Sequence, residues 1–169
     1  MDVESLIGQL ASGADAVGAL MAGYTDEQAR ARPADGAWSP LEVIAHLLDE
    51  ELEDFRPRLD VVLHRPTDKW SPIDPEGWVT AREYNGWSPE ETLASFGDER
   101  ALSIAWIRGL AGPDWDATYN APWGPIRAGD LLAAWAAHDT LHLRQLVELR
   151  RVRDEALAKP YSVRYAGDW

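Results

Sequence analysis

The chain has 169 residues and contains no cysteine. This absence excludes disulfide bonds, thiolate metal ligands and a cysteine nucleophile, and it is compatible with a reducing compartment. No apolar run approaches the ~20 residues that a membrane-spanning helix needs. Residues 1–20 also lack the basic start and the cleavage site of a signal peptide. We therefore expect a cytoplasmic protein.

Basic residues are scarce relative to acidic ones, with 16 Lys and Arg against 29 Asp and Glu and a net charge of −13. A surface this acidic repels the phosphates of nucleic acids and anionic lipids. We therefore expect no nucleic-acid partner and no membrane partner, although a local basic patch is compatible with this charge. The nine tryptophans either fill a helical core or line a pocket.

The hydrophobic pattern predicts four long amphipathic helices. "SPLE" at 39–42 and "SPEE" at 88–91 each join a serine cap, a proline at the first helical position and a glutamate at the third. This combination is a strong helix start. "TDEQ" at 25–28 resembles a capping box that opens one short turn, and Pro57 is expected to kink the second long helix. The predicted long helices cover residues 3–24, 39–63, 88–110 and 127–158.

Four such helices without convincing strands predict an all-α fold, a four-helix bundle that forms a single domain over residues 1–169. The connection at 64–87 is far longer than the few residues that a tight antiparallel turn needs. It is expected to cross the bundle and leave the second and third helices parallel. Residues 113–126 are expected to form a loop, and the tail after Ala158 shows no periodicity.

Two of the four histidines lie four residues apart in the last predicted helix. Imidazoles one turn apart, about 6 Å along the axis, can bind one metal ion. Without thiolates, such a site suits zinc, nickel, iron or manganese. The alternative is a pair of buried, hydrogen-bonded histidines, and a third ligand would decide between the two. The spacing places both histidines on the packed seam of the helix, which consists of Leu131, Trp135, His138, His142, Gln145 and Leu149.

The other two histidines occur in the second helix. His64 lies at its end beside prolines and is expected at the surface. On a simple helical wheel His46 points away from the apolar stripe, which favours a solvated histidine among carboxylates. The alternative is a polar face that lines a cleft, with His46 as a metal ligand and a carboxylate one turn away. The residues that share its face are Glu42, Asp49, Glu50 and Glu53.

The stretches "RPADGAWSPLEVIAHLLDEE" and "HDTLHLRQL" resemble the DinB-like (DinB/YfiT-like) metalloenzyme superfamily, which includes bacillithiol and mycothiol S-transferases. The shared features are a Trp-Ser start to the second helix, a histidine seven residues after the serine, and H-x-x-x-H followed by a glutamine. In this sequence they are Trp38, Ser39, His46, His138, His142 and Gln145.

The resemblance implies an up-down-down-up four-helix bundle, in agreement with the long connection at 64–87. It also implies one divalent metal ion held by His46, His138 and His142, which replaces the wheel's interpretation of His46. Zinc or nickel is expected first, and iron or manganese is an alternative. The mycothiol-dependent isomerase branch usually has a glutamate where His138 stands. The three-histidine set is more similar to the bacillithiol transferase and generic branches.

Three protein ligands leave an open coordination position, as in catalytic metal sites. A metal-bound water there can hydrolyse a substrate, or an external thiol can bind as the nucleophilic thiolate. The resemblance favours a thiol S-transferase whose partners are a small-molecule thiol and an electrophilic substrate. The alternatives are a metal-dependent hydrolase and a non-catalytic metal-binding stress protein. A homodimer is considered as well.

Two side chains near the histidines are candidate catalytic residues. Gln145 either orients a ligand or substrate or is a surface or helix-capping amide. Glu50, like Glu42, lies one turn from His46. Each is a candidate hydrogen-bond acceptor for the imidazole, a fourth ligand or a general base, and the alternative is a solvated acidic face.

Arg100 is the third catalytic candidate, because it follows the seam of the third helix and its guanidinium is directed inward. It must reach out to solvent, pair with a buried carboxylate, or contact an anionic substrate, since an unpaired buried charge is costly. Asp139 lies opposite the seam of the last helix and is expected to be solvated.

Overall fold

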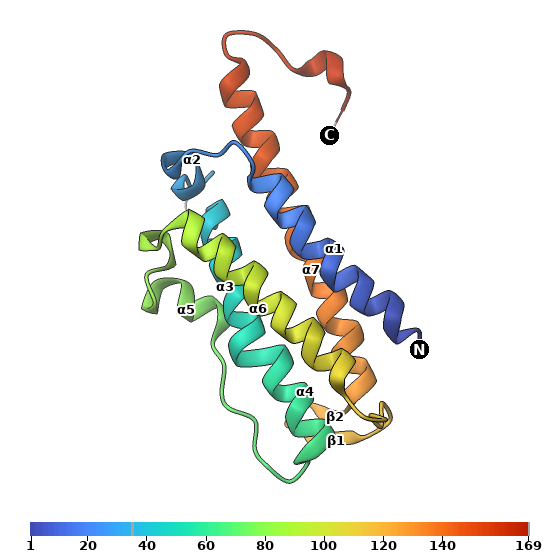
Figure 1. Ribbon diagram of the computed structural model, residues 1–169. Helices are drawn as coiled ribbons and strands as arrows, with labels where there is room; N and C mark the ends of the chain where they lie inside the picture. Colours follow the sequence, from blue (N-terminus) through green and yellow to red (C-terminus); the bar gives the residue numbers. More distant parts are fainter. Residues whose placement is uncertain (35, 169) are drawn as a thin grey trace.

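A computed structural model describes residues 1–34 and 36–168 (Figure 1). The predicted all-α bundle of four long helices is confirmed. None of the described helices is long and apolar enough to cross a membrane. The long helices are α1 (Val3–Met21), α3 (Pro40–Asp49) continued by the π-helix η1 (Glu50–Asp54) and α4 (Phe55–His64), α6 (Pro89–Gly109) and α7 (Ala128–Ala158). The short ones are α2 (Asp26–Arg30), α5 (Pro75–Ala81), η2 (Tyr84–Gly86) and η3 (Arg164–Ala166).

The predicted helix starts are present. The Ser39 hydroxyl accepts a hydrogen bond from the Glu42 amide at 3.2 Å, and the Glu42 carboxylate accepts one from the Ser39 amide at 2.8 Å. This reciprocal pair is a complete capping box, and Thr25 forms the same arrangement at α2. Helix α1 ends at Met21, before the predicted residue 24, and Gly23 follows with a left-handed φ of 78°.

The long connection between α4 and α6 returns the chain to the end of the bundle where α3 begins (Figure 1). The Ser39 hydroxyl, before α3, donates a hydrogen bond to the Asn85 side chain, before α6, at 2.8 Å. The connection also contains α5 and η2, which were not predicted. Asp74 caps α5 and Pro75 occupies its first turn, but a helix of seven residues is too short to show a periodic pattern.

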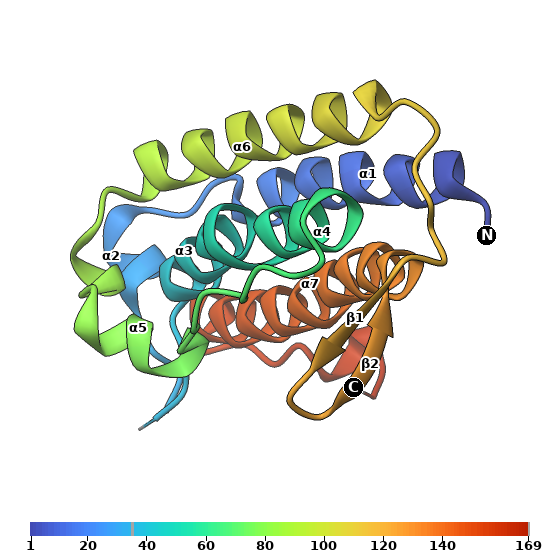
Figure 2. The same cartoon turned by 90° about the horizontal axis from the view of Figure 1, so that it is seen from below.

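The segment 113–126, expected to form a loop, contains an antiparallel hairpin, so that expectation is wrong. Strand β1 (Thr118–Ala121) pairs with β2 (Gly124–Arg127), with Ala121 opposite Gly124. Figure 2 shows the hairpin projecting from the end of the bundle away from α5. The turn lacks the Asn-Gly or Asp-Gly pair that usually signals a two-residue hairpin loop, which is why the sequence did not reveal it.

The second long helix is distorted before Pro57 rather than at it. Proline has no amide hydrogen to donate to the carbonyl four residues earlier, and its ring crowds that carbonyl. The chain adapts with the wider π-helical turn η1, in which the Phe55 amide donates to the Glu50 carbonyl. The extra residue in this turn brings two consecutive carboxylates, Glu50 and Glu51, into the interior, at 4% and 0% exposure.

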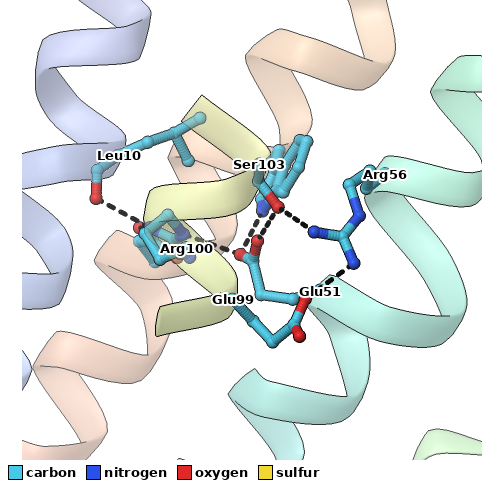
Figure 3. Close-up of polar contacts among 8 residues, drawn as sticks. Leu10, Glu51, Arg56, Glu99, Arg100 and Ser103 are labelled. Atoms are coloured by element: carbon cyan, nitrogen blue, oxygen red, sulfur yellow. Dashed lines mark hydrogen bonds and ion pairs between the residues drawn. The ribbon is translucent and has the colours of Figure 1, made fainter. Parts of the chain in front are cut away.

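The guanidinium of Arg100 occupies the centre of the bundle at 2% exposure and contacts three other helical segments (Figure 3). Its Nε donates to Glu51 of η1 at 2.7 Å. Its Nη1 donates to the Leu10 carbonyl of α1 at 2.8 Å, and its Nη2 donates to Asp139 of α7 at 2.8 Å. Of the three alternatives for Arg100, the structure therefore shows the internal ion pair.

Glu51 accepts two further hydrogen bonds, from the Ser103 hydroxyl at 2.6 Å and from the Trp135 indole at 2.8 Å. This polar network lies between two apolar clusters. One cluster is centred on side chains such as Leu59 and Leu132, and the other on side chains such as Ile44 and Phe96. A polar layer thus divides the core, and it ties all four long helices together.

The expectation that Asp139 is solvated is wrong, because its exposure is 4%. Helix α1 covers the face of α7 opposite the histidine seam, and Gly13 of α1 lies directly against the Asp139 carboxylate. A wheel drawn for α7 alone could not show that a second helix packs there.

Replacement of Gly13 by alanine should destabilise the protein. The new Cβ would clash with Oδ2 of Asp139 and lie 3.2 Å from its Cγ, and overpacking of this kind costs about 1–3 kcal/mol. The matched control is Gly8→Ala, also in α1, where nothing lies within 4 Å and helix propensity should add about 0.5–1 kcal/mol. Urea denaturation measures both. Equal stabilisation by the two substitutions would contradict the close packing at Gly13.

Replacement of Arg100 by leucine should lower the free energy of unfolding by about 3–5 kcal/mol, because Glu51 and Asp139 would remain buried without their cation. The control is Arg108→Leu, since Arg108 is 55% exposed and 3.8 Å from Glu4, a surface pair worth about 0–1 kcal/mol. Chemical denaturation of both variants compares them. A loss below about 1 kcal/mol for Arg100→Leu would show that this ion pair does not anchor the bundle.

Candidate metal centre

Three histidines from two distant parts of the sequence converge in the bundle. His46 comes from α3, and His138 and His142 come from successive turns of α7. Nε2 of His138 lies 3.4 Å from Nε2 of His46 and 3.1 Å from Nε2 of His142. One ligand atom from each of the three lies within 4.8 Å of the others.

This geometry fits a shared metal ion. Nitrogen ligands about 2.0–2.1 Å from zinc in tetrahedral geometry lie ~3.3–3.4 Å from one another, close to the 3.1 and 3.4 Å measured here. In the tautomer with the proton on Nδ1, each imidazole directs its Nε2 lone pair toward the other two, and a cation between them would bind all three. The donor set, imidazole nitrogen without sulfur, is one that zinc, nickel and iron accept.

The electrostatics keep these imidazoles in the neutral form that binds metals. Burial lowers the pKa of His46 to about 3, and the neighbouring His142 and His138 reinforce the shift. Burial likewise lowers the pKa of His138 to about 3, with contributions from His142 and Arg100. The pKa of His142 is lowered by burial, against a hydrogen bond to Gln145. All three side chains are therefore neutral at pH 7.

Gln145 fixes the orientation of His142. Its amide oxygen lies 2.9 Å from Nδ1 of His142, and because an amide oxygen only accepts hydrogen bonds, Nδ1 carries the proton. The lone pair of the imidazole is then on Nε2, directed at the other two histidines. A partner of this kind on the outer nitrogen is a usual feature of metal-bound histidines.

Glu50 lies beside His46, with its Oε1 atom 3.8 Å from the imidazole Nδ1. That oxygen is buried and has no hydrogen-bond partner among the described residues. Burial and the nearby Asp54 carboxylate raise the pKa of Glu50. The site therefore contains a carboxyl group that holds a proton more firmly than an exposed one and lies next to a candidate ligand.

The other predicted residues lie away from the three histidines. Glu42 is fully buried, but it caps α3 and accepts a 3.0 Å hydrogen bond from Arg32. Burial acts to raise its pKa, and the hydrogen bonds from Arg32 and Ser39 outweigh this and lower it. His64 is exposed, as expected, with Nδ1 2.9 Å from Asp60.

Sequence reasoning did not single out Glu51, and it named Trp38 only as part of the family resemblance. Glu51 anchors Arg100, and its burial depends on the π-helical turn; the one signal in the sequence was the nearby Pro57.

The Trp38 indole lies against two of the three histidines, with ring centroids 5.1 Å from His46 and 6.3 Å from His142. A cavity of about 470 Å³ opens beside Trp38, His142 and Gln145. The prediction that tryptophans fill the core or line a pocket therefore applies in both senses.

Comparison with known proteins agrees with this architecture. Among solved structures, one similar to this chain is YfiT from Bacillus subtilis, described as "a probable metal-dependent hydrolase with an unusual four-helix bundle topology". The two chains are 21% identical and superpose with a TM-score of 0.78 over 88% of this chain and 86% of that one. No curated protein sequence matches. The family model of the DinB superfamily matches residues 9–146, a range that contains all three histidines. The chain belongs to the DinB superfamily.

Proposed function

We propose that the protein binds one divalent metal ion through His46, His138 and His142. The observation that carries this proposal is the convergence of three neutral imidazoles whose Nε2 atoms lie 3.1 and 3.4 Å apart. The Gln145 contact to His142 supports it, and so does the description of YfiT as metal-dependent. Zinc or nickel is the proposed ion, with iron or manganese as alternatives.

We propose thiol S-transfer as the reaction, in which a low-molecular-weight thiol attacks a small electrophile. A bound divalent ion would supply Lewis-acid activation of the thiol at the position that the three histidines leave open. The thiol comes from solution, because the chain has no cysteine. Glu50 takes the thiol proton in its ionised form, which is the minor form at pH 7 because burial and the Asp54 carboxylate raise its pKa to about 8. The sulfur then bonds to the electrophilic carbon, and the leaving group departs with the electron pair of its bond. Gln145 holds His142 in place throughout.

The second candidate is hydrolysis, in which the same site activates water. It is favoured by the description of YfiT as a hydrolase. Glu50 would then take the proton from water. Both candidates use the same residues, so they differ in the nucleophile alone. A third candidate, a metal-binding protein without catalysis, would normally have a closed site with four protein ligands.

Metal content tests the ligand assignment. Purified protein should contain one divalent ion per chain by elemental analysis, and His142→Ala should remove it. His64→Ala is the control, because that exposed histidine should leave the metal content unchanged. Unchanged stoichiometry in His142→Ala would contradict the assignment.

The pH dependence of metal binding follows from the lowered pKa values. The pKa of His46 and His138 in the metal-free protein is about 3, whereas an exposed histidine titrates near ~6.5. Protons therefore compete with the metal only well below pH 6.5, and bound metal should be retained at about pH 5.5. Equilibrium dialysis at pH 7.5 and 5.5 measures this. Half-loss near pH 6.5 would show that the imidazoles are not shielded from solvent.

A thiol panel separates the two reactions. Metal-loaded protein should conjugate at least one of bacillithiol, mycothiol and glutathione to a chromogenic electrophile. Glu50→Gln should reduce the rate by about 10²–10⁴-fold, the usual contribution of a positioned proton acceptor, and leave metal content unchanged. If none of the thiols reacts above background while an ester or amide is hydrolysed, the hydrolase candidate is correct.

A further inference from the structure

We propose that a second cavity, between the β1–β2 hairpin and the connection that follows α4, binds an aromatic monocarboxylate. The carboxylate pairs with Arg58, and the aromatic ring lies against Trp123. This inference goes beyond the proposed function and does not depend on it, because none of the three histidines lines this cavity. It gives the protein a ligand site separate from the candidate metal centre.

The cavity has a volume of about 450 Å³, within the ~300–1,000 Å³ of typical small-molecule pockets. It shares no described residue with the cavity beside His142. Arg58 follows His46 by twelve residues in the same long helix, about 18 Å along the axis at ~1.5 Å per residue. The described residues that line the cavity are Arg58, Trp70, residues 71–73, Pro122 and Trp123.

Arg58 is the one residue with a formal charge among these described lining residues. Its guanidinium is held on two sides, since Nε lies 2.7 Å from Oδ1 of Asp54 and Cζ lies 4.7 Å from the centroid of the Trp70 ring. The two Nη groups make no hydrogen bond to any residue that the structure describes, and they are not closed off from solvent. Two parallel N–H donors on one edge of a guanidinium match the two oxygens of a carboxylate.

Arg100 shows how one guanidinium in this protein holds two carboxylates. Its Nε donates to Glu51, while both of its Nη groups donate to Asp139. Arg58 has the first half of this arrangement, with Asp54 at Nε. A ligand carboxylate at the Nη edge would complete the second half without displacing Asp54.

Trp123 supplies the aromatic surface. It lies in the turn between β1 and β2 and is 68% exposed, and its ring centroid lies 5.9 Å from that of Trp70. Trp70 is fixed, because its ring stacks on Tyr119 with centroids 4.2 Å apart and its amide donates to the Tyr119 hydroxyl at 3.2 Å. Since Trp70 contacts both Arg58 and Trp123, a two-ring acid is long enough to reach both. Its rings would remove the exposed indole from water.

The charge of the surroundings favours a monoanion. The net charge of −13 opposes anions at long range, and it opposes dianions and polyanions most. Salt screens charges farther away than about 8 Å at physiological ionic strength, so the direct hydrogen bonds from Arg58 outweigh the remote carboxylates. The same screening separates this cavity from a divalent ion at the three histidines. We therefore expect a monocarboxylate rather than a phosphate.

Nuclear magnetic resonance of the ¹⁵N-labelled protein, as purified, tests the site, because each tryptophan indole gives its own N–H signal. The variants Trp123→Phe and Trp38→Phe assign two of these signals. 2-Naphthoate should shift the Trp123 signal in a saturable way and leave the Trp38 signal, beside the three histidines, unchanged. 2-Naphthamide has the same rings without the charge and should bind about 10-fold more weakly. Inorganic phosphate should cause no saturable shift.

Three variants separate the contributions of charge and ring. Arg58→Gln should weaken the binding of 2-naphthoate about 10-fold and remove its advantage over 2-naphthamide. Trp123→Ala should weaken both compounds about 5-fold, and because this side chain is exposed, the variant should fold normally. The control is Arg108→Gln, the same loss of charge at a 55% exposed position of α6, which should leave both dissociation constants unchanged.

Each part of the proposal can be overturned. Equal binding of 2-naphthoate and 2-naphthamide, or unchanged binding in Arg58→Gln, would overturn the pairing with Arg58. If Arg58→Gln does not fold, unchanged binding in Trp123→Ala would overturn the site instead. A shift of the Trp38 signal without the Trp123 signal would place the acid beside His142. Phosphate binding as tight as that of 2-naphthoate would overturn the ligand class, and equal weakening in Arg108→Gln would show that overall charge sets the affinity.

Discussion

The buried guanidinium of Arg100 is the interaction on which the arrangement of the helices depends. It contacts a carbonyl of α1, a carboxylate of η1 and a carboxylate of α7 at once. A charge in this environment is tolerated only when its donors are all satisfied, so each contact constrains the position of a different helix. Asp139 directly follows His138 in α7. The ion pair therefore fixes the segment of α7 that supplies two of the three imidazoles.

The π-helical turn connects this anchor to the candidate metal centre. In a regular helix two consecutive residues lie about 100° apart around the axis, and one of them would face away from the interior. The extra residue in η1 lets Glu51 reach Arg100 while Glu50 lies beside His46. A single local irregularity thus provides both the anchor of the bundle and the proton-holding group of the site. Single π-helical turns are frequent at functional sites.

The sequence predicted the features that depend on local chemistry. Helix starts such as Ser39–Glu42 could be found because a cap acts within four residues. The seam positions of His142 and Arg100 could be found because each helix has one regular face toward its neighbours. The DinB-like resemblance correctly identified the family, and it brought His46 to the site when the helical wheel did not.

The features that were missed depend on what packs against each helix. The wheel placed His46 in solvent, yet every residue from Pro40 to Asp49 is buried. His46 packs against His138 and His142 of α7, and the connection between α4 and α6 covers Asp49. Tyr84 of that connection donates a hydrogen bond to Asp49. Asp139 was misplaced for the same reason, since α1 covers it. The hydrophobic pattern of one helix does not predict which other segment packs against its polar face, because tertiary contacts determine where that segment lies.

The central claim is that His46, His138 and His142 hold one metal ion in a site that leaves a position open for the reacting thiol or water. X-ray absorption spectroscopy of the zinc-loaded protein tests it most directly. The account predicts three imidazole nitrogens at about 2.0–2.1 Å and one further light ligand, with no sulfur until a thiol is added. A spectrum with fewer than three imidazole nitrogens, or with a fourth protein ligand that fills the open position, would contradict it.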